Sequence, residues 1–270
     1  MLRACSKSIE ETGMEAVTLE IVAPHVALVT IQRPEARNSV NGAVARQLDQ
    51  HVKTIENDPE IWAAVLAGAG GVAFCAGADL KEVSAGRMDD LYTPDGAFAG
   101  FVKHPRKKVW IAGVEGFAMA GGCEIALACD MIVAAEQSVF ALPEVSRGLI
   151  AAAGGIYRLV RALPRAIALE LIATGDRLPA RRAGELGLVN HVVPQGQAVA
   201  EAIAVASRIC ANAPIAVRES LGVARKAYDL DDDALHALGL EAQDRVMQTE
   251  DFAEGPRAFI EKRPAVWKGQ

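Results

Sequence analysis

Hydrophobic and polar positions alternate with short periods along the first two thirds of the chain. Two β-branched runs at residues 17–22 and 26–32, separated by a Pro-His pair, predict a hairpin of strands. Val44, Leu48 and Val52 recur at four-residue spacing, which predicts an amphipathic helix over residues 41–57. This part of the chain is therefore expected to form two strands followed by a helix.

Strands, glycine-rich turns and helices recur after that point, a pattern that predicts the α/β class. The glycine-rich segments 68–79 and 116–122 are expected to be loops, and the polar stretch 84–105 is expected to be a mobile excursion. Further strands are expected at residues 63–67, 109–114, 131–135 and 139–142, and a helix is expected to open over 123–129.

Beyond about residue 196 the predicted strands end and the apolar spacing becomes helical. The chain thus divides into an α/β core over residues 1–195 and a helical C-terminal region over residues 196–270. Helices are expected over residues 197–211, 214–228, 231–248 and 251–262.

Length, composition and charge narrow the class of protein. A chain of 270 residues can bury a large core, and 51% hydrophobic with 23% charged residues is typical of a globular rather than a disordered protein. The 28 basic and 34 acidic side chains give a net charge of −6, which argues against a nucleic-acid groove.

The cysteines, the histidines and the hydropathy of the chain bear on its cellular compartment and on metal binding. The five cysteines form no CxxC pair and are expected to be free thiols of a reducing compartment, and the five histidines form no HExxH zinc motif. The N-terminal residues lack the apolar core of a signal peptide, and no segment resembles a membrane span. We therefore expect a soluble, cytoplasmic protein without a metal.

Glu124 is the first candidate for chemistry, because it follows two glycines in the first turn of an otherwise apolar helix. A carboxylate at this position is stabilised by the helix dipole, so a purely structural role is one possibility. Burial in an apolar helix would raise its pKa, however, and the free N–H groups of a helix start suit a developing negative charge.

Glu144 is the second candidate acid, at the end of a predicted strand. A solvated loop residue or a salt-bridge partner is the alternative. Two carboxylates in one apolar site can divide proton donation from proton acceptance. The sequence GAGGVA at 68–73 fits a weak dinucleotide fingerprint, but no long helix pattern follows it, which argues against nicotinamide binding.

Six strings in order resemble the crotonase superfamily of enoyl-CoA hydratases and isomerases. The resemblance covers nearly the whole chain after the first dozen residues. The strings are RPEARN (33–38), FCAGADLK (74–81), AGGCE (120–124), FALPE (140–144), TGDRL (174–178) and EGPRAF (254–259).

The resemblance implies a fold, a substrate and a reaction. The fold is a spiral of β-β-α units whose helical C-terminal region builds a homotrimer, often paired into a hexamer. The substrate is an acyl-CoA thioester, whose oxygen is held by the N–H groups of Ala78 and Gly121. Glu124 and Glu144 then add water to a trans-2-enoyl-CoA, as in fatty-acid breakdown. No metal or redox cofactor is required, because coenzyme A is part of the substrate.

The phosphates of coenzyme A require a local basic cluster despite the negative net charge. By resemblance, Arg33, Arg37 and Lys81 lie near the coenzyme A moiety, and Lys262 reaches it from a neighbouring subunit. The same resemblance assigns neighbouring positions to substrate binding, namely Ala36, Ala76, Asp79 and Leu80.

Some positions depart from the family pattern and leave alternatives open. Three alanines at 151–153 replace a common Pro-Gly or Pro-Asp, and the absence of an aspartate there disfavours dienoyl isomerisation. Glu115 replaces a common asparagine and is expected to be a third acid near the site or a partner for an arginine. The last residues resemble carnitinyl-CoA dehydratases as well as enoyl-CoA hydratases. The segment 84–105 is expected to shape the acyl pocket.

Enoyl-CoA hydration is therefore the leading hypothesis. Carnitinyl-CoA dehydration, enoyl-CoA isomerisation and hydration of an aromatic enoyl thioester remain alternatives on the same scaffold. A non-catalytic acyl-CoA-binding protein and an NAD-dependent oxidoreductase are more remote ones.

Overall fold

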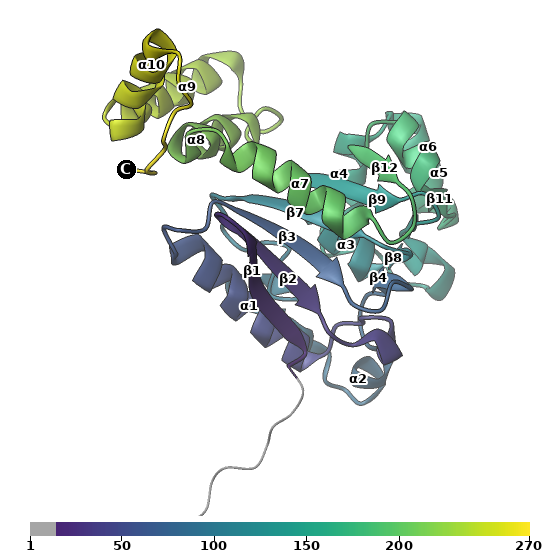
Figure 1. The fold of residues 1–270 in the computed structure, drawn as a ribbon. Helices are drawn as coiled ribbons and strands as arrows, with labels where there is room; N and C mark the ends of the chain where they lie inside the picture. Colours follow the sequence, from purple (N-terminus) through teal and green to yellow (C-terminus); the bar gives the residue numbers. More distant parts are fainter. Residues whose placement is uncertain (1–14) are drawn as a thin grey trace, which may run out of the picture.

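A six-stranded sheet forms the centre of the protein, in a computed structural model that describes residues 15–270 (Figure 1). The first two strands form the predicted antiparallel hairpin, and each later neighbour pairs in parallel. In order across the sheet, the strands are β1 (Val17–Ala23), β2 (Val26–Ile31), β3 (Ala63–Gly68), β7 (Val109–Val114), β9 (Met131–Ala135) and β12 (His191–Val193).

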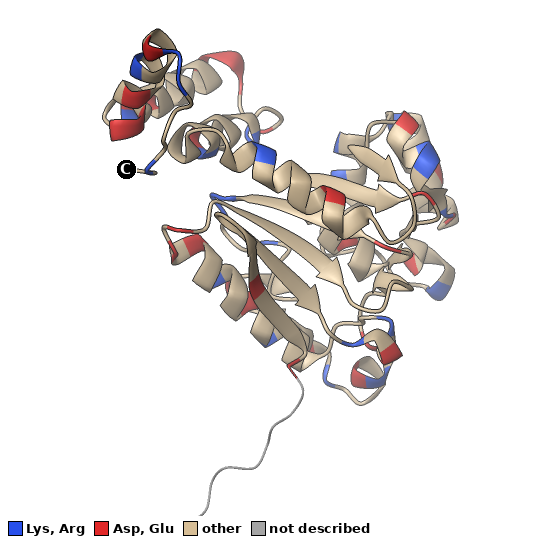
Figure 2. Ribbon diagram, in the orientation of Figure 1, with Lys and Arg blue, Asp and Glu red and all other residues tan. Residues whose placement is uncertain are grey.

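The central strands are buried on both faces, which explains their continuous apolar sequences. All six residues of β7 are buried, and β3 and β7 carry no charged side chain (Figure 2). The sequence of a parallel strand that is covered on both faces is typically a continuous apolar run and not an alternation of apolar and polar residues.

A second, four-stranded sheet turns the chain into a spiral. Its order is β11-β10-β8-β4, and β4, β8 and β10 each follow a strand of the first sheet after a short turn. Gly116 makes the turn before β8 with φ +66°, where a Cβ would lie 1.9 Å from the carbonyl oxygen of Val72. The strands are β4 (Ala73–Cys75), β8 (Phe117–Met119), β10 (Val139–Ala141) and β11 (Leu178–Pro179).

The structure thus corrects the two segments that were expected to be loops, because each contains a strand. β4 and β8 are three residues long, and their sequences are too short to show a period. They are stabilised by pairing with each other and with β10, which the local sequence does not reveal.

The 84–105 segment also contains regular structure that its polar sequence did not suggest. A 3₁₀ helix (Met88–Leu91) leads into a two-stranded hairpin of β5 (Tyr92–Thr93) and β6 (Ala97–Phe98). Leu91, Phe98 and Phe101 are buried, so the segment belongs to the core and brings aromatic side chains to it.

Helices surround the two sheets. The predicted amphipathic helix is α1 (Gly42–Asn57), and the glycines 121–122 open α3. Among the helices that the sequence analysis did not identify, α4 begins beside the predicted acids. The helices before residue 196 are α1, α2 (Leu80–Ser84), α3 (Gly121–Ala128), α4 (Gly155–Ala162), α5 (Arg165–Thr174) and α6 (Ala180–Glu185).

The C-terminal quarter is helical, as predicted. Helix α7 (Ala198–Cys210) packs on the six-stranded sheet, while α8 (Pro214–Ala224), α9 (Asp232–Met247) and α10 (Glu250–Glu261) project away from it (Figure 1). Over residues 15–270, no single helix meets the length and hydropathy needed to cross a membrane, and α7 with α8 does so only as a pair bent by 107°.

Glu115 connects the end of β7 to the start of α7. Its buried carboxylate accepts hydrogen bonds from the backbone N–H groups of Gly196 (3.1 Å) and Ala198 (2.9 Å). Within residues 15–270 it pairs with no arginine. Both expectations for Glu115 are therefore wrong: it satisfies N–H groups at a helix start, where intrahelical acceptors are absent.

Replacing Glu115 by alanine is expected to lower the free energy of unfolding by about 1–3 kcal/mol, because two N–H groups lose their acceptor. Chemical denaturation measures this change. Glu185→Ala is the control, since it removes only an exposed ion pair with Arg182 and should cost below about 1 kcal/mol. Equal losses in the two variants would contradict the capping role.

Candidate active site

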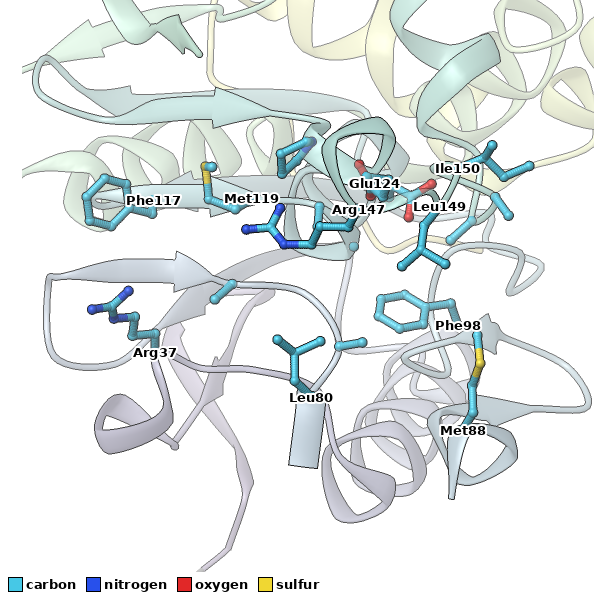
Figure 3. A pocket seen from close by; sticks show the side chains of 18 of the residues that line it. Arg37, Leu80, Met88, Phe98, Phe117, Met119, Glu124, Arg147, Leu149 and Ile150 are labelled. Carbon is cyan, nitrogen blue, oxygen red and sulfur yellow. The ribbon is translucent and has the colours of Figure 1, made fainter. Parts of the chain in front are cut away.

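One cavity brings the two predicted acids together. It has a volume of about 490 Å³, and Glu124 from α3 and Glu144 from the 3₁₀ helix Pro143–Arg147 both line it (Figure 3). Ala78 and Gly121, the predicted oxyanion residues, line the same cavity. The structure therefore assembles all four residues that the resemblance assigned to chemistry.

The start of α3 is packed directly against β4. A Cβ on Gly122 would lie 2.0 Å from the carbonyl oxygen of Cys75, so only glycine permits this approach. Ala120, just before the helix, has φ +52° and ψ −128°, a conformation that is unfavourable for a side-chain-bearing residue. The first N–H groups of a helix have no intrahelical partner, and Ala120 and Gly121 at this helix start line the cavity.

The backbone of Ala78 lies beside this helix start. Val40 N–H donates to the carbonyl of Gly77 (2.8 Å), and Asp79 N–H donates to the carbonyl of Val40 (2.8 Å). Because N–H groups alternate in direction along an extended segment, the N–H of Ala78 points away from Val40. A Cβ on Gly77 would lie 3.0 Å from the nitrogen of Gly121, so the two backbone segments are in contact.

Glu124 is a buried carboxyl, only 3% exposed. Its Oε1 accepts a hydrogen bond from the backbone N–H of Gly155 (2.9 Å), at the start of α4. Burial raises the pKa of Glu124 to about 7, with Glu144 adding to the rise and the backbone hydrogen bonds opposing it. A carboxyl with this pKa exchanges protons readily near neutral pH.

Glu144 differs from Glu124 in its hydrogen bonding. Its Oε2 is buried and has no hydrogen-bond partner among the described residues. Burial raises the pKa of Glu144, and the positive charge of Arg147 opposes that rise. A buried acceptor without a partner is costly, so this oxygen is available to a substrate or a water molecule.

Arg158 fixes the loop that supports Glu124. From α4, its guanidinium donates to the carbonyl of Ala153 (3.0 Å) and to the carbonyl of Val102 (2.6 Å). Ala153 lines the cavity, and its backbone lowers the pKa of Glu124. Among the three alanines at 151–153, Ala153 therefore contributes to the site through its backbone.

The residues expected to bind coenzyme A divide into two groups. Arg37, Ala76 and Leu80 line the cavity. Ala36, Asp79, Lys81 and Lys262 are not among its lining residues, and their contact with coenzyme A stays a prediction.

Asp79 has structural partners of its own. It forms an ion pair with Arg33 (2.9 Å) and accepts a hydrogen bond from the backbone N–H of Lys81 (3.0 Å), which caps α2. The guanidinium of Arg33 also donates to the carbonyl of Ser39. Lys262 follows α10, which lies apart from α2 and α3 in Figure 1. Its contact with coenzyme A across a subunit boundary stays a prediction.

The sequence analysis did not single out several residues that line the cavity. Arg147 lies one helical turn after Glu144, and Arg177 belongs to the TGDRL string, so both had a local signal. Five large apolar members come from the 84–105 segment and from the loop between the Pro143–Arg147 helix and α4. They are Met88, Tyr92, Phe98, Leu149 and Ile150.

Comparison with known proteins adds to this geometry. Residues 23–270 match the family described as enoyl-CoA hydratase/isomerase. The chain is 38% identical over 245 residues to a short-chain-enoyl-CoA hydratase of Clostridium acetobutylicum, covering 88% of this chain and 92% of the relative.

Solved structures show the same likeness. An enoyl-CoA hydratase of Mycobacterium tuberculosis H37Rv matches with a TM-score of 0.91 and 42% identity, covering 95% of this chain and all of that one. A carnitinyl-CoA hydratase of Mycobacterium avium matches with a TM-score of 0.74 and 45% identity, covering 95% and 99%. This chain therefore belongs to the enoyl-CoA hydratase/isomerase family, within the crotonase superfamily that its sequence resembles.

Proposed function

We propose that this protein is an enoyl-CoA hydratase, a hydro-lyase that reversibly adds water to a trans-2-enoyl-CoA. The observation that carries the proposal is the meeting of Glu124 and Glu144 in one cavity beside the backbone N–H groups of Ala78 and Gly121. The chemistry of water addition requires a base, an acid and a site for a negatively charged oxygen, and these residues supply all three without a metal or redox cofactor.

The proposed reaction follows from the position of these groups. The thioester oxygen accepts hydrogen bonds from Ala78 and Gly121, each worth about 3 kcal/mol as negative charge develops on that oxygen. Glu124 removes a proton from water, whose oxygen forms a bond to the β-carbon, and electrons move to the thioester oxygen. Glu144 then delivers a proton to the α-carbon, and the pair titrates as a unit.

The charge distribution of the cavity supports an acyl-CoA substrate. Arg37 and Arg147 lie on one side of Glu124, and Arg177 lies over the ring of Phe117, which lines that side (Figure 3). Apolar side chains line the other side. Coenzyme A carries phosphates and the acyl group is apolar, so the two halves of the substrate match the two halves of the cavity.

Carnitinyl-CoA chemistry is the second candidate, favoured by the 45% identity to the carnitinyl-CoA hydratase. A trimethylammonium group binds well to aromatic faces, and Tyr92 and Phe98 lie in the apolar half as an edge-to-face pair with ring centroids 5.7 Å apart. Comparing turnover of crotonyl-CoA with turnover of carnitinyl-CoA separates the two candidates.

Hydration of crotonyl-CoA is expected to remove the ultraviolet absorbance of its conjugated thioester. Glu124→Gln and Glu144→Gln should each slow this loss about 100-fold or more, because each removes a general acid or base. Glu136→Gln is the control, since Glu136 makes an exposed ion pair with Arg181 and should leave the rate unchanged. Near-normal rates in either cavity variant would remove that glutamate from the mechanism.

The pH dependence of kcat/KM is expected to show an inflection near pH 7. Glu124 must be ionised to act as a base, and with a pKa of about 7 its ionised fraction falls as the pH drops below that value. Arg158→Met should move the inflection to higher pH, because the positive charge of Arg158 lowers the pKa of Glu124.

Arg161→Met is the control on the same helix, since Arg161 makes an exposed ion pair with Asp229. Its inflection should match that of the unmodified enzyme. A profile without inflection between pH 5 and 8 would argue against Glu124 as the base.

The proposed assembly is a homotrimer or a pair of trimers. Large apolar side chains are exposed on the helices that project from the core, notably Phe259 (85%) and Ile260 (78%) on α10. Exposed apolar patches of this kind mark protein interfaces. The cytoplasmic location expected from the sequence stays a prediction.

Light scattering should give a mass of about 86 kDa for a trimer, three times 28.5 kDa, or twice that for a hexamer. Phe259→Asp is expected to shift the mass towards the monomer, because a buried unpaired charge is costly. A monomer in the unmodified protein would contradict the proposed assembly.

A further inference from the structure

The apolar half of the cavity is lined by side chains that are largely exposed to water. Leu80, Met88, Tyr92, Leu149 and Ile150 all line it, and each is between 41% and 67% exposed. Exposed apolar residues scattered singly need no explanation, but a contiguous set around a cavity indicates a binding surface. The question is which ligand covers them.

The position of these apolar side chains relative to Glu124 indicates which part of a ligand would cover them. Figure 3 shows Met88, Phe98, Leu149 and Ile150 together on the side of Glu124 opposite to Arg37. With coenzyme A phosphates near the arginines and the thioester beside Gly121, the remaining part of an acyl-CoA is its hydrocarbon chain. The apolar surface therefore continues directly from the proposed reaction centre.

Phe98 decides the direction in which such a chain can run. Its ring is buried so close to Gly121 that a Cβ on Gly121 would lie 2.5 Å from the ring carbon Cε1. The ring blocks a path past Gly121 into the core. Met88, in the 84–105 segment, and the Leu149–Ile150 pair lie on the same side of the cavity as Phe98 (Figure 3). Each is more than half exposed, so the remaining path leads between them towards solvent.

A short acyl group leaves most of this surface uncovered. A crotonyl group ends a single carbon beyond the reacting double bond, near Phe98. Such a short group cannot cover the half-exposed side chains of Met88, Leu149 and Ile150 together. A longer chain would cover these side chains and would therefore bind more tightly, because burial of apolar surface is favourable.

We propose that the preferred substrates carry acyl chains of medium length, from octanoyl to dodecanoyl, whose distal carbons lie between Met88 and the Leu149–Ile150 pair. This inference rests on the proposed function, because it takes the ligand to be an acyl-CoA. It assigns Leu149 and Ile150 as residues that determine chain-length specificity.

The test measures binding of saturated acyl-CoAs, which cannot be hydrated, by isothermal titration calorimetry with the full chain. The series runs from butyryl-CoA through octanoyl-CoA to dodecanoyl-CoA. Affinity is expected to rise about twofold for each added methylene, roughly half the effect of full burial, because the groove covers one side of the chain. Affinity that is constant or falls with chain length overturns the proposal.

Two variants show whether the gain arises at this surface. Leu149→Asn and Ile150→Asn should each flatten the dependence of affinity on chain length. Leu169→Asn is the matched control, because Leu169 is an exposed leucine on α5 that does not line the cavity. A dependence equally steep in Leu149→Asn and in the unmodified protein would place the chain elsewhere and overturn the proposal.

Hydration assays on the matching enoyl-CoAs separate this inference from the proposed function. Hydration of crotonyl-CoA with length-independent binding would keep the hydratase and overturn the medium-chain preference. Length-dependent binding, abolished in Leu149→Asn, without hydration of any enoyl-CoA would keep the acyl site and overturn the hydratase.

Discussion

The packing of the start of α3 against β4 is the contact on which the rest of the site depends. Gly122 lies against the carbonyl of Cys75, and Gly77 lies against the nitrogen of Gly121. A side chain at either glycine would separate the two backbone segments. Because of this contact, Gly121 and Ala78 line the same cavity, and Glu124, one turn further along α3, lines it too. The proposed oxyanion site and one carboxyl thus depend on a single helix position.

Hydrogen bonds that involve backbone groups connect the other parts of the site to α3. Gly155 donates to Glu124, and Arg158, one turn later on α4, ties the preceding loop to the 84–105 segment. The segments on both sides of the cavity are therefore connected through α4. A buried carboxyl is destabilising in its ionised form, and the Gly155 N–H offsets part of that cost for Glu124. One oxygen of Glu144 has no hydrogen-bond partner among residues 15–270.

The site separates charge in the manner that its proposed substrate requires. Arg37, Arg147 and Arg177 line the cavity although the whole chain carries a net charge of −6. Net charge is thus a poor guide to a local site, because a few cations near one opening are sufficient for phosphate groups. Arg33 illustrates the converse, since its ion pair with Asp79 neutralises a cation that sequence alone would count as free.

The sequence alone was sufficient to predict the hairpin of β1 and β2, helix α1, the buried central strands and the C-terminal helices, because each carries a continuous apolar run or a helical apolar period. Ordered motifs also singled out Glu124, Glu144, Ala78 and Gly121 as candidates, and the structure places all four around one cavity. The short strands β4 and β8 could not be predicted from local sequence, because their stability comes from partners distant in sequence. Chain topology likewise sets the role of Glu115 and the proposed direction of the acyl path, because it determines which hydrogen-bond partners and surfaces lie beside a residue.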